Sequence, residues 1–139
     1  MNKKTKKIEN VTKKFDFRTI KSFEDACKKT GYDPSVAHLP LLPKEFGGAL
    51  IAVLKLFIIF KAINNGWTPN WDDSNQFKYY PWFKVRSSGS GFGFSGSDYD
   101  YDHTCTAVGS RLCTDTSEKA LYIGKQFEKE YEEFFLSKK

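Results

Sequence analysis

Cations and aromatic rings alternate along one stretch of the chain, and this pattern suits a planar, negatively charged ligand. In an extended strand successive side chains point to opposite faces, so every second residue shares a face. The outer face of a strand over residues 76–86 would hold Lys78, Tyr80, Trp82, Lys84 and Arg86, and Arg111 of a later strand can join it. Because rings stack on bases while cations meet phosphates, we expect this face to bind a nucleotide or a single-stranded nucleic acid.

The same strand face has two other interpretations. Lysines protect an exposed edge strand from pairing with other chains, and the tryptophan-containing loop over residues 67–75 could cover the rings. Exposed aromatic residues also mark protein interfaces without identifying the partner. The alternative prediction is therefore a protein-interaction or virion assembly component that uses this aromatic surface as a subunit interface.

The glycine-rich segment 87–97 matches two nucleotide-binding patterns by its letters. Residues 91–96 read GFGFSG, which fits GxGxxG, but a dinucleotide loop must open a helix, and DYDYD follows instead. The letters GFGF also overlap part of an RNA-recognition pattern, without its basic and aromatic flanks. We therefore interpret the segment as a hairpin connection in which Phe92 and Phe94 begin a second strand.

Acidic, histidine and cysteine side chains gather between residues 98 and 105. Asp98, Asp100 and Asp102 would share one strand face, where carboxylate oxygens suit Mg²⁺ or Ca²⁺, but they lack the spacing of a calcium loop and are expected to face water or lysines. His103 and Cys105 would point the same way, too far apart for a direct hydrogen bond. We expect no catalytic residue, no metal site and no cofactor.

The elements that must position these residues follow from periodicity and capping. Ser22 precedes an acid at the third following position, and Gly31 can close a helix, so residues 23–30 are predicted to be helical. Further predicted elements are a short strand over 15–20, a turn at Asp33-Pro34, a long helix from Pro43 to Asn64, a third strand over 106–114 and a last helix that Asp115 caps. The fold class is α+β: a small antiparallel sheet of about three strands with a buried long helix and a C-terminal amphipathic helix packed on one side.

The long helix is apolar around most of its circumference between Leu50 and Phe60. It must then be covered on most sides by the rest of the chain or by a partner. Its apolar run from Ala49 to Ile63 is 15 residues long and contains Lys55 and Lys61, whereas a membrane span needs about 20 apolar residues. We therefore expect a core helix and no membrane association.

Net charge is concentrated at the N-terminus of this 139-residue chain. Residues 1–14 contain six lysines and one glutamate, which account for the whole net charge of +5. We expect a basic, disordered tail over 1–14 and a single α+β domain over 15–139. Three cysteines without paired spacing predict neither a disulfide framework nor a zinc ribbon, which favours a reduced cytoplasm.

Six short motifs together carry a family resemblance. They are FEDAC at 23–27, NNGWTPNW at 64–71, KYYPWF at 78–83, GFGFS at 91–95, VGSRLC at 108–113 and ALYIGKQF at 120–127. As a set they resemble small uncharacterised proteins that Bacteroidales phages, prophages and mobile elements encode. The resemblance implies a phage or prophage origin and a bacterial host cytoplasm or virion setting, and it implies no chemistry. The expected protein partners, host or phage proteins or a second copy of the chain, follow instead from the aromatic surface and the apolar helix.

Overall fold

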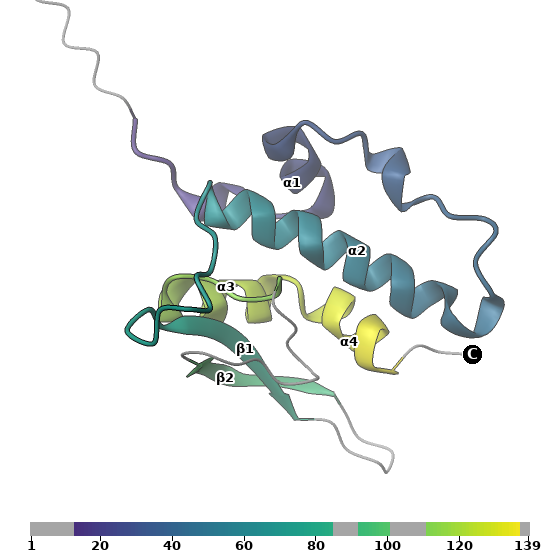
Figure 1. Cartoon of the computed structure of the whole chain (residues 1–139). Helices are drawn as coiled ribbons and strands as arrows, with labels where there is room; N and C mark the ends of the chain where they lie inside the picture. Colours follow the sequence, from purple (N-terminus) through teal and green to yellow (C-terminus); the bar gives the residue numbers. More distant parts are fainter. Residues whose placement is uncertain (1–12, 85–91, 101–110, 137–139) are drawn as a thin grey trace, which may run out of the picture.

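The structure is a computed structural model that describes residues 13–84, 92–100 and 111–136. This part of the chain has the predicted α+β class, with helices and a two-stranded antiparallel sheet (Figure 1). In chain order the elements are η1 (Phe17–Thr19), α1 (Phe23–Thr30), η2 (Pro34–Ala37), α2 (Lys44–Asn64), β1 (Lys78–Lys84), β2 (Gly93–Asp100), α3 (Ser117–Gln126) and α4 (Glu128–Leu136).

The elements stack in layers around α2. Helix α1 packs on one side of α2 and α4 packs on the other, while α3 covers the sheet formed by β1 and β2 (Figure 1). The main core lies between these layers and draws on η1, α1, the C-terminal half of α2, Leu112 and the last two helices. The long helix is therefore held mainly by other helices, and α3 is the element that supports the strands.

The first elements follow from side-chain caps. The Ser22 hydroxyl accepts a hydrogen bond from the Asp25 amide at 3.1 Å, and Gly31 closes α1 with φ +82°, both as predicted. The short strand predicted over 15–20 is wrong, because η1 forms there. The Asp16 carboxylate accepts a hydrogen bond from the Arg18 amide at 3.0 Å, and such a bond stabilises a turn in competition with an extended chain.

Helix α2 is 21 residues long and ends where predicted, at Asn64. The next two residues turn the chain back with left-handed backbone angles, φ 46° at Asn65 and φ 94° at Gly66. Among the described helices, α2 alone has the length and composition to cross a membrane, with a mean hydropathy of 2.2, and 39% of that apolar stretch is buried. A core helix meets the same criterion, so the expected absence of membrane association stays a prediction.

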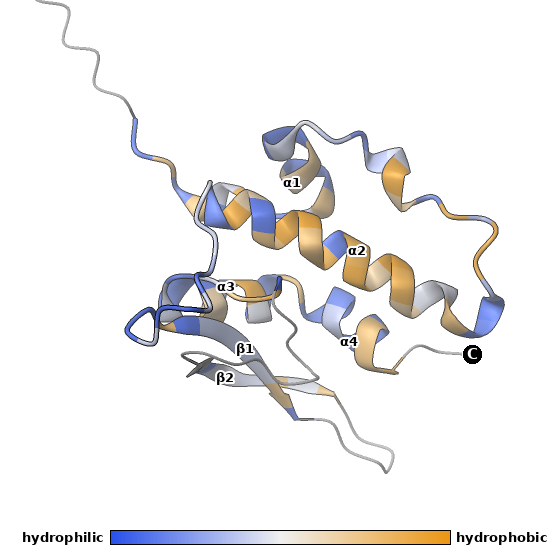
Figure 2. Cartoon of the chain, in the orientation of Figure 1, coloured by the Kyte–Doolittle hydropathy of each residue, from blue (hydrophilic) through white to orange (hydrophobic). Residues whose placement is uncertain are grey.

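The described part of the chain leaves the N-terminal half of α2 largely uncovered, so the predicted buried long helix is buried mainly in its C-terminal half. Leu41, in the loop before α2, exposes 97% of its surface, and Phe46 and Leu50 of the helix expose 54% and 44%. Figure 2 shows apolar residues along α2 and in the loop that leads into it. Buried residues begin at Ala52, and from Ile58 to Asn64 every residue except Lys61 is buried.

The sheet has two strands in the described part of the chain rather than the predicted three. Strand β1 pairs antiparallel with β2, with Tyr80 opposite Asp98 and a bulge between Trp82 and Phe83. Most of the third predicted strand, 106–114, lies outside the described residues. Its last residue, Thr114, makes an isolated antiparallel bridge to Tyr79 through hydrogen bonds of 2.9 and 2.8 Å.

The glycine-rich pattern at 91–96 contributes to a strand, since Gly93 to Gly96 belong to β2. Phe92 and Phe94 pack against Phe83, with ring centroids 4.8 and 5.8 Å apart, and Phe83 lies 4.4 Å from the ring of Tyr131 in α4. These phenylalanines therefore serve the core. A phosphate loop would require a helix to follow, and a strand follows instead.

The C-terminal region contains two helices where one was predicted. The Thr116 hydroxyl, not Asp115, caps α3 by accepting a hydrogen bond from the Lys119 amide at 3.2 Å. The helix breaks at Phe127, whose amide still bonds to the Ile123 carbonyl at 2.9 Å, and α4 follows. The break lets α3 pack on the sheet while α4 packs on α2.

Candidate functional site

Lys78 does not belong to an outer strand face, although the alternation of β1 predicted that it would. Its side chain is fully buried, and its ammonium donates a hydrogen bond to the Asp73 carbonyl at 2.9 Å. The same nitrogen lies 5.2 Å from the ring centroid of Trp71. The tryptophan-containing loop thus folds over the start of the strand, and Lys78 ties that loop to the body of the protein.

The other predicted face residues are divided between separate places. Tyr80 is half-buried, while Trp82 and Lys84 are exposed on β1. Arg86 lies outside the described residues. Arg111 is exposed beside α2, in a groove that no residue of β1 lines. The structure therefore separates Arg111 from the strand residues with which the sequence grouped it.

This groove lies beside the C-terminal half of α2 and has a volume of about 440 Å³. Ligand pockets for small molecules span roughly 300 to 1,000 Å³. Its lining is mainly apolar and aromatic, with two cations and without a carboxylate among the described residues: Tyr32, Val36, Leu54, Phe57, Ile58, Lys61, Asn64, Trp67, Thr68, Pro69 and Arg111. We take it as the candidate site.

Helical spacing and the turn after α2 build the groove. Phe57, Lys61 and Asn64 recur at four- and three-residue intervals, which places them on one side of the helix. The turn at residues 65–66 then brings Trp67 back, and its amide donates to the Asn64 carbonyl at 3.0 Å. One continuous stretch of chain thus supplies a floor, a cation and an aromatic wall.

Asn64 also anchors the other side of the groove. Its side-chain amide nitrogen donates to the Cys113 carbonyl at 2.9 Å, which fixes the segment that carries Arg111 against the end of α2. The Asn64 side-chain oxygen is buried and has no hydrogen-bond partner in the described part of the chain. This oxygen does not reach the surface of the groove, so we assign Asn64 a positioning role.

Both cations of the groove lie against aromatic rings. The Lys61 ammonium is 3.2 Å from the Tyr32 hydroxyl and 4.9 Å from the centroid of its ring. The Arg111 guanidinium carbon is 5.9 Å from the centroid of Phe57. Such contacts hold a long cationic side chain in place and leave its other hydrogen-bond donors available to a ligand.

The described thiols are poor nucleophiles. Burial raises the pKa of Cys113 from 9.0 to about 12, although the positive charge of Lys78 acts in the opposite direction. Burial, followed by the charges of Glu24 and Asp33, also raises the pKa of Cys27. A nucleophilic cysteine needs a lowered pKa, so neither thiol is prepared for covalent catalysis.

The predicted acidic cluster and histidine–cysteine pair fall mostly outside the described residues. Asp98 is exposed on β2, and Asp102, His103 and Cys105 belong to the segment that the structure does not describe. Among the residues that it does describe, no three His, Cys, Asp or Glu side chains come together to hold a metal ion. The argument for a candidate site therefore depends on the apolar and cationic lining of the groove beside α2.

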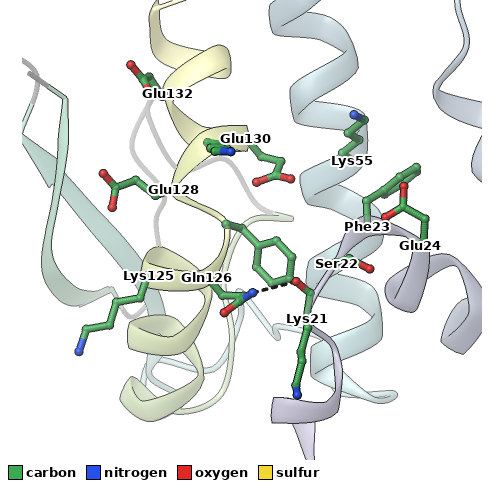
Figure 3. Close-up of a pocket in the computed structure, with 12 residues that line it drawn as sticks. Lys21, Ser22, Phe23, Glu24, Lys55, Lys125, Gln126, Glu128, Glu130 and Glu132 are labelled. Atoms are coloured by element: carbon green, nitrogen blue, oxygen red, sulfur yellow. Dashed lines mark hydrogen bonds between the residues drawn. The ribbon is translucent and has the colours of Figure 1, made fainter.

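A second hollow, of about 640 Å³, opens between α1, α2 and the last two helices (Figure 3). Lys125, Glu128 and Glu132 point outward from it, whereas Glu130 extends toward α2 (Figure 3). The Gln126 side chain donates to the Lys21 carbonyl at 2.8 Å and closes one end. As many lysines as glutamates line this hollow, so it offers no net charge for an ionic ligand.

The comparisons with known proteins add no relative: no protein-family model, curated protein or solved structure matches the chain. The site therefore has to be argued from its own residues. Sequence reasoning missed Tyr32, Phe57, Lys61 and Trp67. The helical spacing of Phe57 and Lys61, followed by Gly66-Trp67, could have indicated part of the groove from local sequence alone. The contact of Tyr32 with Lys61, 29 residues away in the sequence, could not.

Proposed function

We propose that the protein is a non-enzymatic phage or prophage accessory protein that binds a planar anionic ligand, a nucleotide or single-stranded nucleic acid, in the groove beside α2. The observation that carries the proposal is the pair of cations against aromatic rings, Lys61 with Tyr32 and Arg111 with Phe57. A base can stack on the rings, and the two cations can donate hydrogen bonds to the phosphate of the nucleotide. The phage setting comes from the motif resemblance.

The lining supports an anion over a neutral or cationic ligand. Lys61 and Arg111 are not opposed by any carboxylate among the described lining residues. The apolar remainder, which includes Leu54 and Ile58, favours a ligand with a flat or hydrophobic body. A nucleotide combines both properties in one molecule.

The test is a titration of a panel of mononucleotides and of fluorescently labelled dT12 against the purified protein. Lys61→Gln and Arg111→Gln should each weaken binding about tenfold, because a hydrogen bond to a charged group contributes roughly 1.5 to 3 kcal/mol and about 1.4 kcal/mol is tenfold. Lys125→Gln removes an outward-pointing lysine elsewhere (Figure 3) and should bind like the wild type.

Two results would contradict the proposal. One is no binding by the wild type, or equal binding by all of these variants. The other is loss of binding in Trp82→Ala with Lys61→Gln unaffected, which would place the ligand on the exposed ring of β1 instead.

A second candidate function is self-association, as a protein-interaction or virion assembly component. The observation that favours it is the uncovered half of α2, where Phe46 and Leu50 lie one helical turn apart and expose about half of their surfaces. Neighbouring exposed apolar side chains on one helix face are characteristic of interaction sites. This candidate uses the opposite end of α2 from the groove, so the two functions are separable.

A further inference from the structure

The groove beside α2 does not end at Trp67 but continues into an adjoining hollow of about 380 Å³. Lys61, Trp67 and Thr68 line both spaces, so these side chains form the ridge between them. The remaining lining of the second hollow comes from the end of α1 and the end of α2: Lys29, Thr30, Ala62, Asn65 and Gly66. The two hollows therefore share a wall and lie next to each other.

The second hollow repeats the charge character of the first. It is lined by Lys29 and Lys61, and no carboxylate lines it among the described residues. The Lys29 ammonium lies 4.2 Å from the centroid of Phe15, so it too is held against an aromatic ring. Three cations therefore follow one another along the path: Arg111 in the groove, Lys61 at the ridge and Lys29 in the second hollow.

A third hollow, of about 690 Å³, adjoins Trp67 and is also lined by Lys14, next to the start of the described chain. Its described lining holds three cations and three carboxylates, which include the pairs Arg18 with Glu118, and Lys119 with Asp115 at 2.8 Å. It therefore adds little charge for a ligand.

We infer that the ligand is a stretch of single-stranded nucleic acid at least two nucleotides long, which crosses Trp67 with one base in each hollow. Its linking phosphate meets Lys61 at the ridge, and Arg111 and Lys29 meet the flanking phosphates. This inference rests on the proposed function and specifies its ligand class, since a free mononucleotide would occupy only one of the two hollows.

The arrangement fits the way sequence-tolerant single-strand binders work. They combine a cationic path along the backbone with aromatic side chains that accept successive bases, and their affinity depends strongly on salt. Here Trp67 and Tyr32 supply rings, and the three lysine and arginine side chains supply the path. Interactions with phosphates and ring faces do not read base identity, so little sequence preference is expected.

The experiment compares dTMP with dT2, dT4 and dT8 on the full chain at one salt concentration. We expect at least a tenfold gain in affinity from dTMP to dT4. Lys29→Gln should weaken dT4 binding threefold or more without changing dTMP binding, while Lys125→Gln changes neither. Trp67→Leu should weaken dT4 binding more than dTMP binding, and its melting temperature checks that the variant is folded.

If the protein bound dTMP and dT4 with equal affinity, and Lys29→Gln changed neither affinity, the single-strand inference would be overturned. The proposed nucleotide function would still hold. Absence of binding to every probe would overturn both. Repeating the series with uridine oligomers distinguishes RNA from DNA as the source of the strand.

Discussion

The ammonium of Lys61 lies 3.2 Å from the hydroxyl oxygen of Tyr32 and 4.9 Å from the centroid of its ring. This contact joins the last turns of α2 to the segment that follows α1, and it fixes a cation at the rim of the groove. The ring and the hydroxyl make different contributions. The ring can stack on a ligand, whereas the hydroxyl only orients Lys61 and competes with an incoming phosphate for its protons.

Substitution of Tyr32 separates these two roles. Tyr32→Ala should weaken binding of dT12 about tenfold, because stacking of a base on an aromatic side chain contributes roughly 1 to 3 kcal/mol. Tyr32→Phe retains the ring and should stay within about threefold of the wild type. Tyr32 exposes 43% of its surface, so neither change should lower the melting temperature appreciably. Equal losses in both variants would show that the hydroxyl, not the ring, matters for binding.

Lys78 should matter for stability and not for ligand binding. Its stem is fully buried and its ammonium holds the Asp73 carbonyl, so Lys78→Ala should lower the free energy of unfolding by about 2 to 4 kcal/mol in urea denaturation. Lys78→Met keeps most of the packing and should lose less. Lys84→Ala, at an exposed position of the same strand, should stay within about 0.5 kcal/mol of the wild type. If Lys78→Ala were as stable as the wild type but bound dT12 more weakly, Lys78 would belong to the binding surface.

Lys78 also shows where prediction from the sequence reached its limit. The pattern of residues 76–86 predicted a strand, and β1 forms within it at Lys78–Lys84, because aromatic residues and alternation favour extended structure. Which face is covered depends on the loop over 65–77, which folds back so that Trp71 lies over the Lys78 ammonium. The bulge between Trp82 and Phe83 then breaks the alternation. Neither event is encoded in local periodicity.

The helices were predicted more successfully than the site, for a physical reason. Capping and periodicity are local, so Ser22, Gly31 and the end of α2 at Asn64 could be placed from neighbouring residues alone. The groove instead requires Tyr32, Lys61 and Arg111 to meet, and these come from segments far apart in the sequence. Their residue types were visible in the sequence, but their proximity was not.

Stability should fall as the solution becomes alkaline, because of Cys113. Its folded pKa of about 12 lies above the ordinary value of 9.0, so between these values the unfolded chain has lost a proton that the folded protein keeps. Each pH unit in this window should therefore cost up to about 1.4 kcal/mol of unfolding free energy. Burial also raises the pKa of Tyr131 well above its ordinary value, which acts in the same direction.

Urea denaturation at pH 8, 9, 10 and 10.5 measures this alkaline loss. Above pH 9 the free energy of unfolding of Cys113→Ala should decline less steeply with pH than that of the wild type. Part of the remaining decline is due to Tyr131. The same substitution at Cys27, whose pKa is also raised, serves as a comparison. A wild-type stability that is constant from pH 8 to 10.5 would show that the Cys113 thiol is not sequestered from water.

The exposed half of α2 predicts concentration-dependent self-association. Phe46→Glu and Leu50→Glu together place charge on this face, and should convert an associated species into a monomer in sedimentation equilibrium. Because both side chains are largely exposed, the melting temperature at low protein concentration should change little. Leu56→Glu, at a fully buried position of the same helix, should instead unfold the protein. A wild type that stays monomeric at every concentration would eliminate the self-association candidate.

Two glycine-to-alanine substitutions in helices should have opposite effects on stability. A methyl group at Gly47 would meet only the Leu42 side chain, at 3.6 Å, so Gly47→Ala should stabilise the protein by about 0.5 to 1 kcal/mol through helix propensity. A methyl group at Gly124 would overlap the ring of Phe94 and lie 3.0 Å from Pro81. Gly124→Ala should therefore destabilise by about 1 to 3 kcal/mol, because α3 would be forced away from the sheet.

A double-mutant cycle tests whether this close approach of Gly124 and Phe94 is the cause. Phe94→Leu alone should destabilise, since it removes a ring that packs against Phe83 at 5.8 Å. Combined with Gly124→Ala it should cost less than the sum of the two single changes, because the smaller side chain makes room for the added methyl group. A coupling free energy of about 0.5 kcal/mol or more in urea denaturation is expected for residues in contact. Strict additivity would mean that Gly124 is not held against Phe94, and that α3 does not pack on β2 through this glycine.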